Sequence, residues 1–211
     1  MEVIPRETRK ITYSTEIRNL IKKLTLNDHQ MAVLIGTILG DGHLEPNWSK
    51  TNYKLKINHC LKHRNYTFWK YRIFKDWVLT KPKFDRWNNS FQFRTVSHRE
   101  ITKLRNKFYK NGKKIIPRDI RKYLKNPITL AVWFMDDGNI KGTAYNINTQ
   151  SYSKNENKLL AKCLLDLHGI TANLEKNHQK YYRLYIPKLS ARIFENIVRN
   201  FVTTDMKYKL G

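Results

Sequence analysis

The sequence is poor in acidic residues, in cysteine and in long apolar runs. It contains 17 Asp and Glu residues against 41 Lys and Arg residues among 211, a formal net charge of +24. Cys60 and Cys163 are isolated and form no CxxC pair, so we expect neither a disulfide framework nor a structural zinc site. The longest apolar run, residues 31–39, is far shorter than the roughly 20 residues that span a bilayer. With no cleavable apolar segment near its start, we expect no membrane partner and no secretion.

The excess of positive charge predicts a polyanionic partner. Such a charge would repel itself in a compact chain unless an anionic surface lay against it. A membrane-surface protein or a ribosomal-type protein would carry its charge in tails or in one amphipathic helix. Here the lysines and arginines are spread along the chain among aromatic residues, and 40% of the residues are apolar, enough for a packed core. The pattern favours a folded nucleic-acid-binding surface.

Two apolar segments, residues 31–42 and 130–138, stand apart from this basic background. Each is apolar on every side, which predicts a buried helix. Each ends in Asp-Gly, and the final glycine stands where a helix end often needs a positive φ. The acids before those glycines, Asp41 and Asp137, are unexpected at a buried helix end, and they indicate a functional pair.

The same order of elements follows each segment, which predicts an internal duplication. Period-two stretches, helical stretches and hairpin candidates recur with the acids separated by 96 positions (41 to 137). The expected elements are strand 53–59, helix 63–78, hairpin 84–87 with 91–94 around Asn88-Asn89, and helix 98–109, then strand 144–149, helix 154–168, hairpin 174–176 with 182–186, and helix 189–201. We predict an α+β fold of two pseudo-symmetric αββαββα halves, residues 1–117 and 118–211, the second beginning with a linker over 118–127.

These motifs resemble the paired signatures of the LAGLIDADG homing endonucleases, in residues 34–42 (LIGTILGDG) and 130–138 (LAVWFMDDG). The stretches 133–138, 148–151, 206–210 and 113–117 are similar to the intron-encoded yeast mitochondrial branch. The resemblance runs from about residue 31 to the C-terminus. It implies two signature helices packed together at the centre of antiparallel sheets that form a DNA-binding saddle. It also implies a monomer with both motifs in one chain, and placement in the mitochondrion.

Close approach of the signature helices requires small residues at four-residue spacing, which Gly36 and Gly40 supply. Val132 and Asp136 stand at the equivalent positions of the second helix, so we expect the first helix to provide most of the close backbone contact.

The resemblance implies a metal-dependent phosphodiesterase. Asp41 and Asp137 would repel each other strongly beside DNA phosphates unless cations lay between them. Hard ions such as Mg²⁺ or Mn²⁺ take oxygen ligands, and two or more such ions are expected here. The family pattern adds the backbone carbonyls of Gly40 and Asp136. The side chain of Asp136 lies about 100° around the helix from that of Asp137 and is not expected to be an equal ligand.

The motif positions also assign a basic residue to each active site, Lys114 and Lys209, to stabilise developing negative charge. Lys113 and Lys207 are the neighbouring alternatives. His59 and Gln150, or Thr149 in place of Gln150, are the polar residues expected to order water. His59 also lies four residues from His63, but no second ligand pair points to zinc.

The outward faces of the strands are expected to read a long, asymmetric double-stranded DNA site. Arg, Lys, Gln and Asn side chains can reach base edges in the major groove or hold phosphates. The candidates are Lys54, Lys56, Asn58, Arg86, Gln92, Arg94, Asn146, Asn148, Lys176, His178 and Arg183.

Two other functions remain open. A maturase of the same fold would bind its own group I intron RNA, and the basic surface would serve either polyanion. A non-cleaving DNA-binding protein would leave Asp41 and Asp137 as costly buried charges without a purpose. Retention of both acids favours site-specific cleavage of double-stranded DNA.

Overall fold

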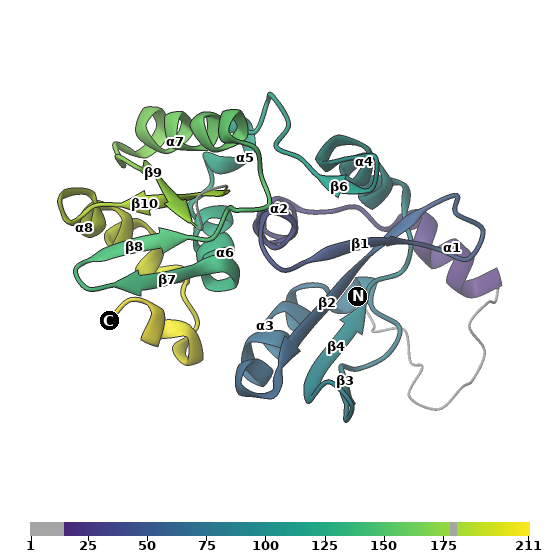
Figure 1. Cartoon of the computed structure of the whole chain (residues 1–211). Helices are drawn as coiled ribbons and strands as arrows, with labels where there is room; N and C mark the ends of the chain where they lie inside the picture. The colour runs from purple at the N-terminus through teal and green to yellow at the C-terminus, as the bar shows by residue number, and fades with distance from the viewer. Residues whose placement is uncertain (1–14, 178–180) are drawn as a thin grey trace. The chain divides into compact units, whose positions relative to one another are not determined.

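The computed structural model describes residues 15–177 and 181–211, and it forms two compact units. The first unit comprises the chain up to residue 31 together with residues 41–106, and the second comprises residues 32–40 and 107–211. Each unit contains one four-stranded antiparallel sheet with helices against one of its faces (Figure 1). The expected boundary near residue 117 stays a prediction of sequence duplication.

The predicted element order is confirmed twice along the chain. After the additional helix α1 (Thr15–Lys23), the first repeat consists of α2 (Asp28–Leu39), β1 (His43–Pro46), β2 (Tyr53–Cys60), α3 (Arg64–Ile73), β3 (Lys83–Asp85), β4 (Ser90–Arg94) and α4 (Arg99–Phe108). The second repeat consists of α6 (Pro127–Asp137), β7 (Gly138–Lys141), β8 (Ala144–Ile147), α7 (Lys154–His168), β9 (Asn173–Asn177), β10 (Tyr181–Ile186) and α8 (Lys188–Val198). Both read αββαββα.

Short elements connect and end the repeats. They are β5 (Tyr109–Lys110), β6 (Lys113–Lys114), α5 (Arg121–Leu124) and the 3-10 turns η1 (Leu61–His63), η2 (Lys75–Trp77), η3 (Arg199–Phe201) and η4 (Thr204–Lys209). The turn between β5 and β6 uses Asn111 and Gly112 at φ 50° and 78°, the left-handed pair that a two-residue hairpin favours. The described part of the chain contains no helix long and apolar enough to cross a membrane.

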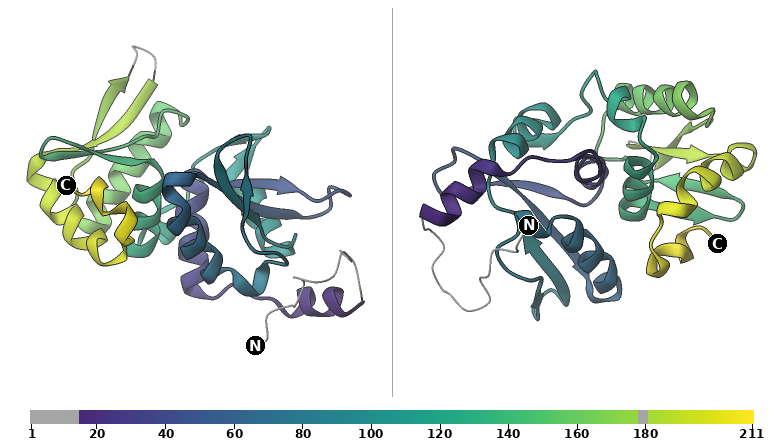
Figure 2. Two further views of the ribbon diagram at one scale, coloured as in Figure 1. Left: turned by 90° about the horizontal axis from the view of Figure 1, so that it is seen from below. Right: turned by 180° about the vertical axis from the view of Figure 1, so that it is seen from behind.

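The two sheets share one topology, β1-β2-β4-β3 and β7-β8-β10-β9. In the first sheet, Leu55, Ile57 and Phe93 face α3, where Phe93 meets the ring of Tyr71 edge-on. In the second sheet, α7 contacts β9 and β10 and α8 contacts β8 (Figure 2). Because helices cover only one face of each sheet, alternate strand residues are left on the opposite face for a ligand.

Local signals fix the helix ends. Ser153 and Glu156 form a capping box at the start of α7, and Gly169 ends that helix at φ 67°. Asn126 caps α6 by accepting a hydrogen bond from the backbone N–H of Ile128, with Pro127 as the first helical residue.

The predicted positive φ at the two Asp-Gly glycines is wrong. Gly138 has φ −89° and ψ 156°, and Gly42 is not among the described residues with positive φ. A Cβ at Gly138 would lie 2.0 Å from Cδ2 of Phe134. Space beside the aromatic ring, rather than backbone conformation, therefore requires glycine at position 138.

Candidate active site

The second unit packs residues 32–40 of α2 against α6 with almost no side chain between them. A Cβ at Gly36 would lie 2.7 Å from the carbonyl oxygen of Thr129 and 2.7 Å from Cβ of Val132. The Thr129 hydroxyl donates a hydrogen bond to the carbonyl of Ala32 across this contact, at 3.2 Å. The expected close approach through Gly36 is therefore confirmed within this unit.

The same contact continues to the C-terminal ends of both helices. A Cβ at Gly40 would lie 2.3 Å from Cβ of Asp136 and 2.9 Å from its Oδ2. Gly40 and Asp136 immediately precede Asp41 and Asp137 in the sequence. The two acids are thus the next residues along the chain after two residues in contact. The side chain of Asp136 lies over Gly40.

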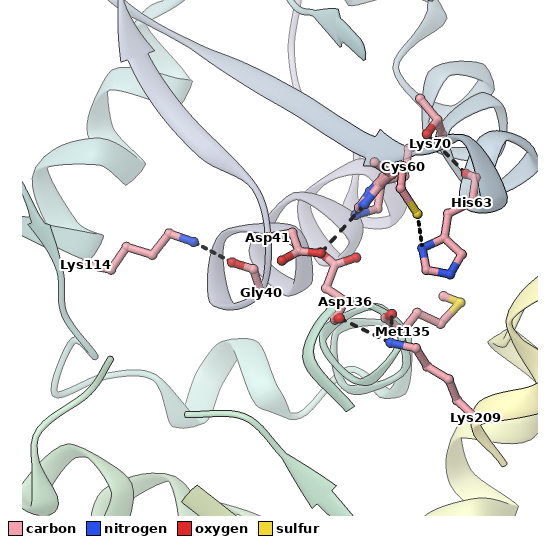
Figure 3. A network of polar contacts seen from close by, with 11 residues as sticks. Gly40, Asp41, Cys60, His63, Lys70, Lys114, Met135, Asp136 and Lys209 are labelled. Atoms are coloured by element: carbon pink, nitrogen blue, oxygen red, sulfur yellow. Dashed lines mark hydrogen bonds and ion pairs between the residues drawn. The ribbon is translucent and has the colours of Figure 1, made fainter. Parts of the chain in front are cut away.

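Two lysines bind the last carbonyls of these helices in matching ways. Lys114 Nζ donates to the Gly40 carbonyl at 2.5 Å, and Lys209 Nζ donates to the carbonyls of Met135 and Asp136 at 2.5 Å and 3.2 Å (Figure 3). Helix C-termini leave carbonyls without intrahelical partners and carry partial negative charge, which attracts a cation. The structure thus brings both predicted lysines to the signature helices. The alternatives Lys113 and Lys207 are exposed.

Tyr152, which the sequence reading missed, binds the same end of α2. Its buried hydroxyl donates to the carbonyl of Leu39 at 3.0 Å. Burial raises the pKa of Tyr152, and the negative charge of Asp137 raises it further, so this hydroxyl stays protonated and remains a donor. No periodicity distinguishes Tyr152 from the other 11 tyrosines of the chain.

The loop after β8 separates the two candidates for ordering water. Thr149 is fully buried, and its hydroxyl donates to Oδ1 of Asn157 at 2.5 Å. The amide of Asn157 in turn donates to the carbonyls of residues 149, 152 and 153. Gln150 is partly exposed, 3.4 Å from Oδ1 of Asn148. Thr149 and Asn157 therefore hold the loop, and Gln150 is left as the side chain able to meet a ligand.

In the first unit, Asp41 lies beside His59. Oδ2 of Asp41 is 3.7 Å from Nδ1 of His59, and the Asp41 side chain is 50% exposed whereas that of His59 is 4% exposed. On its other side, Nε2 of His59 lies 3.3 Å from Nζ of Lys70, a lysine that is fully buried. The sequence reading missed Lys70, although helical spacing places it on one stripe with the buried Tyr66 and Phe74.

The predicted basic face of the first sheet is present. The strand pairing places Lys54, Lys56, Asn58, Gln92 and Arg94 on the face opposite to α3. Glu45 joins this face, with carboxylate Oε1 lying 3.5 Å from Lys54 Nζ and 3.1 Å from Arg94 Nε. Arg86 is exposed in the turn between β3 and β4.

The corresponding face of the second sheet departs from expectation at two positions. Asn148 and Arg183 are partly exposed, but Asn146 is only 1% exposed because it lies between its cross-strand neighbours Asn139 and Tyr185. Lys176 pairs with Tyr182 and therefore lies on the helix-covered face, opposite to Arg183. A one-residue error in strand register reverses the face of a side chain, which explains the Lys176 error. His178 lies outside the described residues.

Comparison with known proteins identifies relatives across most of the chain. A model of the LAGLIDADG DNA endonuclease family matches residues 31–194. The chain is 30% identical over 200 residues to the probable intron-encoded endonuclease 1 of Wickerhamomyces canadensis, covering 88% of this chain and 85% of that protein. It is 26% identical over 197 residues to the cytochrome b mRNA maturase bI2 of Debaryomyces hansenii, covering 88% of this chain and 75% of that protein.

Solved structures have the same architecture. The homing endonuclease I-WcaI, solved bound to its DNA recognition sequence, superimposes with a TM-score of 0.85 at 27% identity, covering 95% of this chain and 94% of I-WcaI. The endonuclease I-DmoI, solved with its target DNA and manganese, is similar in fold with a TM-score of 0.51 at 13% identity, covering 85% and 97%.

Proposed function

Because the chain belongs to the LAGLIDADG DNA endonuclease family, we propose that it is a homing endonuclease that recognises one long DNA site and hydrolyses a phosphodiester bond in each strand. The observation that carries the proposal is the contact of Gly40 with Asp136, which joins the chain positions directly before Asp41 and Asp137. A duplicated chain with one acid after each signature helix provides two hydrolytic centres in one polypeptide. We accordingly expect a monomer to be active.

The donor atoms near the acids suit a hard divalent ion such as Mg²⁺ or Mn²⁺. The half-exposed carboxylate of Asp41, the carboxylate of Asp137 and the carbonyls of Gly40 and Asp136 are all oxygen donors. A carbonyl that accepts from a lysine keeps a second lone pair for another partner. When bound, divalent ions activate water and stabilise charge on the leaving oxygen. We assign Asp41 and Asp137 to hold two or more such ions.

Lys114 and Lys209 neutralise charge next to these oxygens. Their ammonium groups already lie at the carbonyls of Gly40 and Asp136. A phosphodiester under attack gains negative charge, and a preorganised cation stabilises that charge more effectively than water does. Gln150 and His59 are the polar residues that we assign to orient water or ligands in the second and first centre.

The two sheet faces explain why the target is expected to be asymmetric. The first face carries Lys54, Lys56, Asn58, Gln92 and Arg94. The second carries Asn148 and Arg183 at the equivalent place, with Glu175 in salt bridges to Lys141 and Arg183. Because different side chains read each half, two identical half-sites would not satisfy both. We propose that these residues and Arg86 contact DNA.

Purified protein tests the proposal through cleavage of a randomised duplex library in Mg²⁺. Selected sites should be long and non-palindromic, and affinity should fall steeply with salt, as many phosphate contacts require. Asp41→Asn and Asp137→Asn should abolish cleavage while the dissociation constant for the selected duplex stays within about threefold of that of the wild-type protein. Asp28→Asn, at the exposed opposite end of α2, is the matched control and should cleave normally. Cleavage by both of the first two variants would overturn the assignment.

A second function, assistance to splicing of a group I intron, is favoured by one observation. The Debaryomyces hansenii relative is an mRNA maturase with similar coverage and 26% identity. The basic sheet faces would attract RNA as well as DNA. Competition separates the two readings: if intron RNA at equal concentration displaces the cognate duplex, the protein has a maturase's ligand, and if unrelated RNA competes equally, it has not. The yeast intron-encoded relatives also lead us to propose a mitochondrial location, which tagged protein in fractionated cells would test.

A further inference from the structure

Lys70 is a buried lysine attached to the Asp41 side of the candidate site. It belongs to α3, has no exposed surface, and places Nζ 3.3 Å from Nε2 of His59 and 4.5 Å from the ring centre of Tyr66. A buried ammonium is costly unless polar groups surround it. A helix that needed only packing at this position would carry an apolar residue, so the lysine indicates a function.

The contact fixes which nitrogen of His59 carries the proton. An ammonium group has donors and no acceptor, so Nε2 must accept its hydrogen bond with a lone pair. In neutral imidazole the proton then resides on Nδ1. Nδ1 is the atom that faces Oδ2 of Asp41, at 3.7 Å. His59 thus presents an N–H group, not a lone pair, to the carboxylate.

We propose that Lys70 is a positioning residue that locks His59 in the Nδ1–H tautomer and so reserves the ion site at Asp41 for ions ligated by oxygen. A neutral imidazole nitrogen with a free lone pair is a good ligand for Ni²⁺, Co²⁺ and Zn²⁺. With the proton held on Nδ1, His59 cannot supply that ligand, and Asp41 keeps its other oxygen, Oδ1, for a hard ion. The catalytic meaning of this arrangement rests on the proposed endonuclease function, but the tautomer does not.

The tautomer can be measured directly by ¹⁵N-edited NMR of the imidazole in the full chain, without DNA or metal. We expect the wild-type His59 spectrum to show a protonated Nδ1 and an unprotonated Nε2. In Lys70→Met, which has a similar length and no donor, the signal should shift toward the other tautomer, and Lys70→Arg should restore the wild-type pattern. Arg72→Met, exposed on the same helix, is the control for loss of one positive charge. A protonated Nε2 in the wild-type protein would overturn the proposal without any variant.

Ion binding and cleavage provide the second measurement. Lys70→Met should bind Ni²⁺ about tenfold more tightly, and its single-turnover cleavage in Mg²⁺ should fall about tenfold at unchanged duplex affinity, the usual scale for groups that orient a ligand from behind. Adding His59→Ala should remove the Ni²⁺ gain. If the wild-type protein cleaves no duplex while the tautomer is as expected, the endonuclease proposal fails and the inference about Lys70 stands. If the wild-type protein cleaves and Lys70→Met matches it in spectrum, Ni²⁺ affinity and rate, the inference fails alone.

Discussion

Replacing Gly36 with alanine should destabilise the second unit, although alanine normally stabilises a helix. The added Cβ would lie 2.7 Å from both the Thr129 carbonyl oxygen and the Val132 Cβ. Ordinary contacts of this kind are near 3.5–4.0 Å, so α2 and α6 must separate by about 1 Å. The first contact is with backbone, which cannot rotate away as the end of a side chain can.

The net effect combines three contributions. Alanine in place of glycine in a helix gains about 1 kcal/mol of free energy of unfolding. Overpacking costs about 1–3 kcal/mol, and separating the helices lengthens the hydrogen bond from Thr129 to the Ala32 carbonyl, which costs about 1 kcal/mol. We expect a net loss of about 1–3 kcal/mol, or a melting temperature lower by about 2–4 °C for each kcal/mol in a chain of this size.

Thermal and urea unfolding followed by circular dichroism measures this loss. Gly142→Ala is the control, because Gly142 has open space around it and a φ of 61°. That variant should lose about 1–2 kcal/mol from backbone strain alone and should keep its cleavage rate. Gly36→Ala should lose cleavage as well, since separating the helices moves the carbonyl that binds Lys114. An increase of about 1 kcal/mol in the stability of Gly36→Ala would refute the close packing.

Other perturbations test separate parts of the account. Lys114→Met and Lys209→Met should each slow cleavage of a single strand by about 10²-fold, so that nicked duplex accumulates on a denaturing gel, whereas equal loss on both strands would contradict one lysine per centre. Hydrogen bonds from Lys141 and Arg183 lower the pKa of Glu175, so its carboxylate contributes stability above the ordinary pKa, and this contribution is lost as pH falls through the lowered value. Glu175→Gln should therefore flatten acid unfolding in that range, and it should also raise affinity for unrelated duplex in a salt titration; unchanged curves would show that these ion pairs are inert. Ser153→Ala should lose about 1 kcal/mol in urea unfolding, with no change in cleavage, because it removes only the cap of α7.

The repeated architecture could be predicted because its signals are local and strong. All-round apolar segments ending in Asp-Gly, the alternation of residues 53–59, and Gly169 after an apolar helix each correspond to an observed element. The short 3-10 turns and α1 carried no such signal. The helix predicted over residues 63–78 is α3 followed by η2, because Phe74 leaves helical geometry at φ −99° and ψ 18°.

The site was only partly visible in the sequence, since its contacts join residues far apart in the chain. Motif position was enough to place Lys114 and Lys209. The roles of Tyr152 and Asn157 depend on a buried loop whose hydrogen bonds no spacing reveals. The error at Lys176 arose because the hairpin register, and not composition, decides the face of each side chain.

Anomalous scattering from Mn²⁺ in a crystal of the protein with its selected duplex tests the central assignment most directly. The account predicts manganese peaks bonded to carboxylate oxygens of both Asp41 and Asp137, beside the scissile phosphates. Peaks bonded elsewhere on the protein, with either carboxylate distant from every ion, would contradict it.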